Sequence, residues 1–274
     1  MSGHATGWPA SLVLAGAGKM GGAMLRGWLA LGMPANAITI VDPFVSEDMK
    51  ALSAEHGFDI NPRNPRKPEV LVLAIKPQML DEASADIAPL IGPETMVISI
   101  LAGKTIADLA ARLPATAIVR AMPNTPAAVG RGITGAAASA ATNQAQQELA
   151  GRLLGAIGQV VWLDDEDLID AVTAVSGSGP AYVFYLAEAM AKAGEEAGLP
   201  ANLAMQLARA TVEGAGELMF RDTETAADQL RINVTSPGGT TAAALDVLMA
   251  ADGLAPLMRR AIMAARDRAR ELSG

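Results

Sequence analysis

The segment Leu12-Val-Leu-Ala-Gly-Ala-Gly-Lys-Met-Gly21 is the strongest indication of the fold of this 274-residue chain. Its apolar start predicts a buried strand, and the Gly-x-Gly-x-x-Gly pattern at the end of that strand opens a helix. In that context Gly16 allows a tight turn, Gly18 lets the backbone approach a pyrophosphate, and Gly21 lets the helix pack on the strand. A purely structural turn is the alternative. We expect a dinucleotide to contact Gly16, Ala17, Gly18, Lys19, Met20 and Gly21.

Asp42 strengthens this interpretation by its position. An acidic residue about 20 positions beyond the third glycine typically binds the ribose of a dinucleotide, and Asp42 lies at that spacing. Its carboxylate would accept a hydrogen bond from a free 2′-hydroxyl and repel a 2′-phosphate, which favours NADH over NADPH. Alternatively, Asp42 only starts the turn that continues with Pro43. The expected cofactor is therefore NADPH or NADH.

The first half of the chain alternates short apolar runs with helical patterns. Strands are expected at residues 12–15, 37–41, 70–75, 96–101, 117–121 and 159–163. Helices are expected at residues 20–31, 48–56, 78–87, 106–112 and 143–157. This alternation predicts a parallel sheet with right-handed crossover connections.

The second half changes to long helical segments from about Asp164. Pro180 suits a first helical turn, and later helices are expected at residues 202–220, 240–250 and 254–272. The fold class is thus α/β, with a Rossmann-type parallel-sheet domain over residues 10–164 and an all-helical domain over residues 165–274. Glycines inside the helical patterns indicate close helix contacts, of the kind that subunits share, at Gly194, Gly214 and Gly216.

Composition narrows the class of protein. A net charge of −8 and a pI near 4.8 oppose a nucleic-acid or anionic-membrane partner, because either requires a basic face. The absence of cysteine excludes disulfides and thiolate zinc sites, and it agrees with a cytoplasmic location. The acidic run at residues 164–167 favours a solvated helix start over a metal site, so no metal is expected. The apolar run at residues 12–17 is too short to span a bilayer.

Three further loops follow the carboxyl ends of later strands, where open α/β sheets bind ligands. They cover residues 74–78, 99–103 and 120–126. Each loop by itself could be only a strand-to-helix turn. Since all three are expected at the same edge of the sheet, together they favour a cofactor groove. The candidate groove residues are Ala74, Lys76, Pro77, Ala102, Met122 and Asn124.

The segment at residues 233–241, Asn-Val-Thr-Ser-Pro-Gly-Gly-Thr-Thr, precedes an alanine-rich helix and is called the carboxylate loop below. The first backbone N–H groups of a helix have no internal partner, and with the helix dipole they suit a small carboxylate. A glycine turn before a threonine-capped helix is the alternative interpretation.

Five motifs, in this order, resemble those of the pyrroline-5-carboxylate reductases, and the resemblance covers residues 12–272. They are Gly16-Ala-Gly-x-Met20, Lys76-Pro-Gln78, Met122-Pro-Asn-Thr-Pro126, Ser176-Gly-Ser-Gly-Pro-Ala-Tyr182 and Thr235-Ser-Pro-Gly-Gly-Thr-Thr241. The resemblance implies a helical dimerisation domain after the Rossmann domain. It also implies NAD(P)H-dependent reduction of L-1-pyrroline-5-carboxylate to L-proline by a homodimer or a larger ring of dimers.

The resemblance also assigns residues to parts of the site. It places Ala17, Lys19 and Met20 along the pyrophosphate, although the family often has Asn or Gln where Lys19 stands. The nucleotide groove would be lined by Asn61, Ala74, Lys76 and Ala102, and Asn233 would reach the nicotinamide side. The substrate would be held by Ser236, Gly239, Thr240 and Thr241, with Glu166 and Glu224 at nearby acidic positions.

The chemistry of an imine agrees with the residues present. A protonated iminium accepts hydride from a positioned nicotinamide, whereas a hydroxy-acid dehydrogenase needs a Lys or His for the alcohol proton. After Ser176 to Pro180 no lysine occurs before Lys192, which weakens an alcohol substrate. Thr241 is the candidate catalytic residue because its hydroxyl can hydrogen-bond the ring nitrogen. The alternatives are a related hydroxy- or amino-acid dehydrogenase and a non-catalytic nucleotide sensor.

Overall fold

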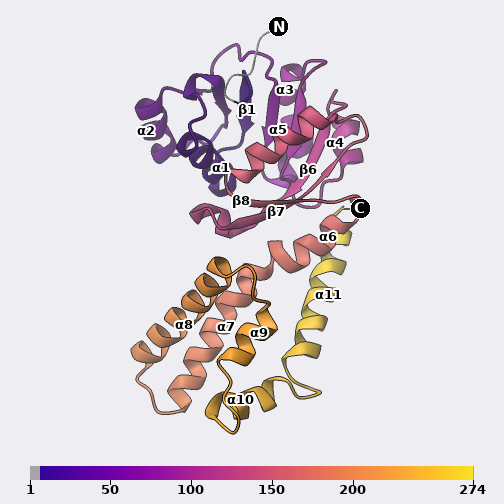
Figure 1. Cartoon of the computed structure of the whole chain (residues 1–274). Coiled ribbons are helices and arrows are strands. Elements are labelled where there is room, and N and C mark those ends of the chain that lie inside the picture. The colour runs from indigo at the N-terminus through magenta and orange to yellow at the C-terminus, as the bar shows by residue number, and fades with distance from the viewer. Residues whose placement is uncertain (1–6, 274) are drawn as a thin grey trace. The chain divides into compact units, whose positions relative to one another are not determined.

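The computed structural model describes residues 7–273, and its first part is built on one sheet (Figure 1). The strand order is β3-β2-β1-β4-β5-β6-β7-β8. The strands are β1 Leu12–Ala15, β2 Ile38–Val41, β3 Asp59–Ile60, β4 Val70–Leu73, β5 Met96–Ser99, β6 Ile118–Met122, β7 Gly132–Ala138 and β8 Gly158–Trp162. The predicted α/β class and all six predicted strands are confirmed.

One strand departs from the predicted parallel order. β7 runs antiparallel to β6, and β8 returns parallel to β7. The reason is the connection between β6 and β7, which holds only a short 3₁₀ segment, Thr125–Val129. A parallel neighbour needs a crossover of a dozen or more residues, so the chain turns back instead.

Both faces of the sheet are covered by helices. These are α1 Lys19–Ala30, α2 Glu47–His56, α3 Leu80–Ile87, α4 Ile106–Arg112 and α5 Gln144–Gly155, all within predicted helical segments or one residue of them. Alternate residues of β1 enter two separate cores: Leu12 and Leu14 pack with α1 and α5, and Val13 and Ala15 pack with α3 and α4. Burial on both faces explains why these strands are apolar throughout rather than alternating.

The chain divides into two compact units by its contacts. Unit 1 comprises the residues up to Gly177 together with those from Arg266 onward, and unit 2 comprises Ser178–Ala265. The remaining helices are α6 Leu168–Val172, a π-helical turn Thr173–Gly177, α7 Gly179–Glu196, α8 Ala201–Arg221, α9 Ala227–Asn233, α10 Thr240–Leu248 and α11 Leu254–Ser273. The predicted division into a cofactor-binding domain at residues 10–164 and a substrate-binding domain at residues 165–274 concerns function, and it stays a prediction. Across residues 7–273, no helix combines the length and apolar character needed to cross a bilayer.

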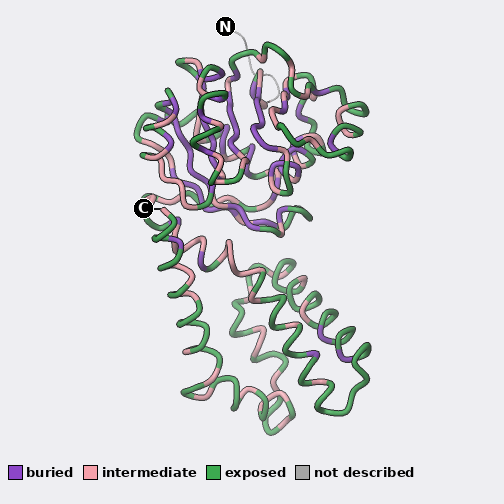
Figure 2. The backbone as a smooth tube through the Cα atoms, turned by 180° about the vertical axis from the view of Figure 1, so that it is seen from behind, coloured by how far each residue is buried: buried purple, intermediate pink, exposed green. Residues whose placement is uncertain are grey.

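Unit 2 buries little of its own apolar surface, whereas the central strands β1, β4 and β5 of unit 1 are buried throughout (Figure 2). In the described part of unit 2 the buried hydrophobic residues are Ala191, Ala204 and Ala208, where α7 meets α8. Gly194 serves that contact, because a Cβ there would lie 3.3 Å from the Cβ of Ala204. A Cβ at Gly214 or Gly216 would instead meet open space within the single chain.

Candidate functional site

The three glycines of the first loop have three different constraints. Gly16 has φ +93°, and a Cβ there would come within 2.6 Å of the Ala74 carbonyl oxygen. A Cβ at Gly21 would clash with the Gly16 carbonyl, so helix α1 packs against the loop only because that side chain is missing. Gly18 caps α1 without a side-chain hydrogen bond and faces open space. The first N–H groups of α1, at Lys19 and Met20, therefore open onto room for a phosphate.

Asp42 forms the second part of this edge, directly after β2. Its Oδ2 accepts a 2.7 Å hydrogen bond from the N–H of Ala17, and its Oδ1 accepts one of 2.7 Å from the N–H of Phe44. Asn61 holds the backbone of Asp42 on both sides: its Oδ1 accepts the Asp42 N–H at 3.0 Å, and its Nδ2 donates to the Asp42 carbonyl at 2.8 Å. Asn61 adopts φ 47° to do so. The structure thus brings Ala17, Asp42 and Asn61 together, and their predicted contacts with a cofactor stay predictions.

The loops after β4 and β5 continue the same edge. The Ala74 N–H donates to the Ala15 carbonyl at 2.7 Å, which joins the loop after β4 to the end of β1. Lys76 is exposed and comes just before a 3₁₀ turn that starts at Pro77. Ala102, after β5, is also exposed. These positions are open to a ligand, and their contacts with a nucleotide stay predictions.

Asn124 has a structural task in this chain. Its side chain is buried, with Oδ1 accepting the Ile133 N–H at 3.0 Å and Nδ2 within 3.3 Å of both the carbonyl and the hydroxyl oxygen of Ser176. It therefore ties the start of β7 to the π-helical turn after α6. Met122, the last residue of β6, is partly buried, and its terminal methyl group lies beside Gly177. Asn124 is also a predicted cofactor contact. Because its side chain already bonds Ile133 and Ser176, a cofactor could bind Asn124 without breaking these bonds only through its backbone.

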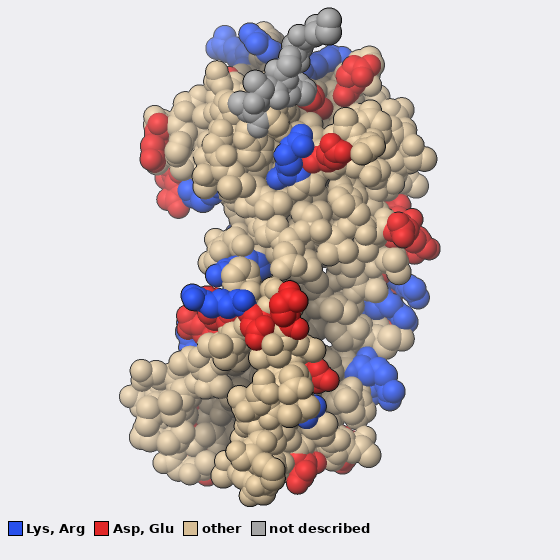
Figure 3. All heavy atoms as spheres, in the orientation of Figure 1, with Lys and Arg blue, Asp and Glu red and all other residues tan. Residues whose placement is uncertain are grey.

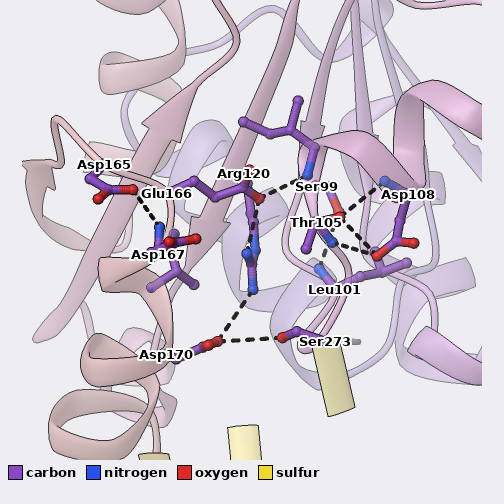
Figure 4. A network of polar contacts seen from close by, with 12 residues as sticks. Ser99, Leu101, Thr105, Asp108, Arg120, Asp165, Glu166, Asp167, Asp170 and Ser273 are labelled. Atoms are coloured by element: carbon purple, nitrogen blue, oxygen red, sulfur yellow. Dashed lines mark hydrogen bonds and ion pairs between the residues drawn. The ribbon is translucent and has the colours of Figure 1, made fainter. Parts of the chain in front are cut away.

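Sequence reasoning missed Arg120, which organises the neighbouring polar network (Figure 4). Arg120 is 4% exposed, and its Nη1 donates to Glu166 Oε1 at 2.9 Å while its Nη2 lies 3.8 Å from Asp170 Oδ1. Glu166 Oε1 also accepts the N–H of Ile106, the first residue of α4, at 2.8 Å. Arg120 is the one charged residue in the apolar run at residues 117–121, and this feature of the sequence could have indicated a buried ion pair. The predicted role of Glu166 is a substrate contact, but here its carboxylate holds α4 and Arg120.

The carboxylate loop lies wholly in unit 2. Gly238 has φ +69°, and the Gly239 N–H donates to the Ser236 carbonyl at 3.0 Å, which closes a tight turn. Gly239 then caps α10 without a side-chain hydrogen bond, so Thr240 and Thr241 begin the helix uncapped. The loop is thereby preformed, with helix-start N–H groups of the kind that bind carboxylates.

Asn233 lies at the other end of this loop, as the last residue of α9. It is exposed, and its Oδ1 accepts a 2.8 Å hydrogen bond from Gln229 Nε2. Thr235 continues the turn, with its hydroxyl donating to the Arg231 carbonyl at 2.7 Å. No group of three or more His, Asp or Glu side chains is placed to hold a metal ion in the described part of the chain.

A Rossmann-type sheet, a glycine loop opening α1 and a ribose-side acid after β2 define a dinucleotide-dependent oxidoreductase. Two family models match: "NADP oxidoreductase coenzyme F420-dependent" over residues 11–103 and "Pyrroline-5-carboxylate reductase dimerisation" over residues 166–272. A pyrroline-5-carboxylate reductase from Pseudomonas aeruginosa is 42% identical over 94% of this chain and 95% of its own length. The chain belongs to the pyrroline-5-carboxylate reductase family.

Solved structures agree with this assignment. The chain is similar to a pyrroline-5-carboxylate reductase from Coxiella burnetii, with 34% identity, a TM-score of 0.89 and coverage of 97% of this chain and 99% of the other. It is also similar to the pyrroline carboxylate reductase of Plasmodium falciparum, whose structure has NADP bound, with 26% identity, a TM-score of 0.80 and coverage of 97% and 98%. A Haemophilus influenzae relative of the same name is 40% identical over 85% of this chain and 86% of its own length.

Proposed function

We propose that this chain carries out its family's reaction, the NAD(P)H-dependent reduction of L-1-pyrroline-5-carboxylate to L-proline, with the residues described above. Residues 10–164 would hold the cofactor and residues 165–274 the substrate. The cofactor fits the edge of unit 1, because Gly18 leaves open space in front of the uncapped start of α1. When bound, the reduced nicotinamide supplies a hydride.

The observation that carries the substrate assignment is the uncapped start of α10 behind the turn that Ser236 and Gly239 close. Its free N–H groups would bind the substrate carboxylate, and the half-exposed Thr241 hydroxyl would hydrogen-bond the ring nitrogen. The protonated imine carbon then accepts the hydride, and the electron pair of the C=N bond becomes the lone pair of the ring amine. Since the iminium is already electrophilic, the chain mainly has to position it.

Two features of unit 2 support assembly of subunits. Large apolar side chains are exposed on α7 and α8, including Phe184, Tyr185, Leu207 and Leu218, and Figure 3 shows few charged groups over much of this unit on the face that it draws. Exposed apolar surface of this extent marks an interface. We place the chain in a homodimer, or a larger ring of dimers, in the cytoplasm.

The test is an assay of NADH and NADPH oxidation with pyrroline-5-carboxylate, beside a panel of keto acids and other cyclic imines. We expect turnover with pyrroline-5-carboxylate and much slower turnover with every keto acid. Preferential turnover of a keto acid would support the dehydrogenase alternative, because a hydroxy-acid dehydrogenase running in reverse reduces the keto acid. Cofactor binding without turnover of any compound would support the nucleotide sensor.

A further inference from the structure

The loop at residues 100–105, called the cofactor loop below, follows β5 and is held only loosely by its own bonds. It contains Ala102, one of the candidate residues of the nucleotide groove. The Leu101 N–H donates to Ser99 Oγ, and the Lys104 N–H donates to the Leu101 carbonyl, both at 3.3 Å. These distances exceed the usual range of about 2.7–3.2 Å for such bonds. Contacts from outside the loop therefore matter for its position.

The last turn of α11 lies directly against the middle of the cofactor loop. Gly103 has φ +70°, and a Cβ there would come within 2.8 Å of the Leu272 carbonyl oxygen and 3.1 Å of the Leu272 Cβ. Only a glycine allows two backbone segments to approach so closely. Both residues belong to unit 1, which includes the chain from Arg266 onward. The backbone of Leu272 is thus a support for the loop, while the Leu272 side chain is exposed.

Ser273 anchors this end of α11 to a charged group on α6. Its hydroxyl lies 3.4 Å from Asp170 Oδ1 and 3.1 Å from the carbonyl oxygen of Ala269, which is buried. Asp170 in turn lies 3.8 Å from Nη2 of Arg120, and Figure 4 shows it between Arg120 and Ser273. Asp170 therefore links the last turn of α11 to strand β6.

Arg120 is connected to the cofactor loop by two routes. One route leads through Asp170 and the end of α11 to Gly103. The other leads through Glu166, whose Oε1 accepts bonds from Arg120 Nη1 at 2.9 Å and from the N–H of Ile106 at 2.8 Å. Ile106 directly follows the loop, and the planar guanidinium of Arg120 fixes the two carboxylates in one arrangement. The loop is thereby held at its middle and at its end.

We propose that the end of α11 positions the cofactor loop, and that Asp170 and Ser273 are positioning residues of the reaction because they hold this helix end. The inference rests on the proposed dinucleotide site, and it assigns a role to side chains outside the cofactor and substrate sites. Release of the helix end should loosen the loop and weaken cofactor binding. The carboxylate loop belongs to unit 2, so the KM for pyrroline-5-carboxylate should change little.

The experiment measures the Kd of NADPH and of NADH by calorimetric titration of the full chain. Asp170→Ala removes the acceptor of the Ser273 hydroxyl, and we expect about threefold weaker binding of the cofactor. The KM for pyrroline-5-carboxylate should stay within about twofold of the wild-type value. The matched control is Asp167→Ala, which removes an exposed carboxylate at the start of the same helix and should leave both quantities unchanged.

Ser273 supplies an independent variant of the same bond. Ser273→Ala should weaken cofactor binding in the same direction as Asp170→Ala, whereas Ser273→Thr keeps the hydroxyl and should bind the cofactor like the wild type. Because the titrations need no turnover, failure of the proposed reaction would appear separately, as tight cofactor binding without reduction of pyrroline-5-carboxylate.

A double-variant cycle tests whether the end of α11 carries the effect. Gly103→Ala places a methyl group against the Leu272 carbonyl, and we expect about tenfold weaker cofactor binding. Asp170→Ala lets the helix end move away, so the double variant should also lose about tenfold, rather than the roughly thirtyfold expected of independent sites. The control is Gly57→Ala, with φ +84° and no atom within 4 Å of an added Cβ. It should leave cofactor binding unchanged in both backgrounds.

Three results would overturn the inference. One is cofactor binding by Asp170→Ala as tight as by Asp167→Ala, a comparison that does not require Gly103→Ala to fold. Another is a loss in the double variant equal to the product of the two single losses. The third is a rise in the KM for pyrroline-5-carboxylate as large as the rise in the cofactor Kd of Asp170→Ala, as expected of a general loosening of the chain.

Discussion

Thr241 is the second residue of α10, in the first turn of a helix whose start has no side-chain cap. The backbone groups can bind a carboxylate without the Thr241 hydroxyl, so loss of the hydroxyl should affect the chemical step more than binding. We expect Thr241→Ala to lower kcat by on the order of tenfold, the worth of about one hydrogen bond, with little change in the cofactor KM.

Thr241→Ser keeps the hydroxyl and is expected to retain most of the activity in the same steady-state assay. Wild-type turnover in Thr241→Ala would remove Thr241 from the mechanism. A large loss in both variants would show that the methyl group, and hence packing, is what matters.

Asn61 both hydrogen-bonds the backbone of Asp42 and adopts a positive φ, and two substitutions can measure these effects separately. Its amide bonds both sides of the Asp42 backbone, and its φ of 47° is unfavourable for a residue with a Cβ. Asn61→Ala loses the bonds and keeps the Cβ, whereas Asn61→Gly loses the bonds and the Cβ together and so relieves the unfavourable angle. We expect urea unfolding to show a loss of about 1–3 kcal/mol for Asn61→Ala and a smaller loss for Asn61→Gly. Equal losses would mean that the backbone angle costs nothing here.

At the scale of elements, α4 begins with a capping box that carries a titrating group. The Thr105 hydroxyl accepts the Asp108 N–H at 3.0 Å, and Asp108 Oδ2 accepts the Thr105 N–H at 3.0 Å. Burial by itself raises the pKa of Asp108, but hydrogen bonds from Thr105 and the charges of Lys104 and Arg112 outweigh it. The pKa therefore lies below the usual 3.8.

The sign of the resulting pH dependence follows from that lowered pKa. The carboxylate stabilises the folded chain fully above its unfolded pKa of 3.8, and this contribution is lost as the pH falls through the lower folded value. We expect Asp108→Asn to cost about 0.5–1 kcal/mol at pH 7 and progressively less below about pH 4, measured by urea unfolding. Asp86→Asn, on the exposed side of α3, is the control. A cost that does not depend on pH would refute the role of the charge.

The elements that the sequence did not predict lack a strong local pattern. β7 reads Gly-Ile-Thr-Gly-Ala-Ala-Ala, in which only Ile133 and Thr134 favour a strand, and it is held in the sheet by pairing with β6 and β8. β3 holds only Asp59 and Ile60, and α9 buries no side chain in the chain by itself. The predicted helices were recognisable because their apolar periodicity and caps agree locally.

At the scale of the whole molecule, unit 2 needs a partner to bury its apolar surface. Phe184 on α7 is 64% exposed, which is unusual for a phenylalanine in an isolated subunit. We expect sedimentation equilibrium of the wild-type chain to give at least twice the 28.1 kDa chain mass. Phe184→Asp should shift the mass toward 28.1 kDa, because a charge would be buried in the interface.

Glu195→Gln, at an exposed position on the same helix, should leave the assembly unchanged. If Phe184→Asp sediments like the wild type, the interface lies on another face of unit 2. A folded wild-type monomer at micromolar concentration would contradict the proposed dimer.

The α/β class, the glycine loop and the residues of the carboxylate loop could be recognised without the structure. These depend on local constraints, such as the positive φ of Gly16 and the uncapped start of α10, that a short stretch of chain expresses. The contacts of Asp42, Asn124 and Glu166 could be learned only from the folded chain, because their partners Ala17, Ser176 and Arg120 lie far away in the sequence. Pairing of polar groups across such distances is set by how the strands stack in the sheet, which no local pattern records.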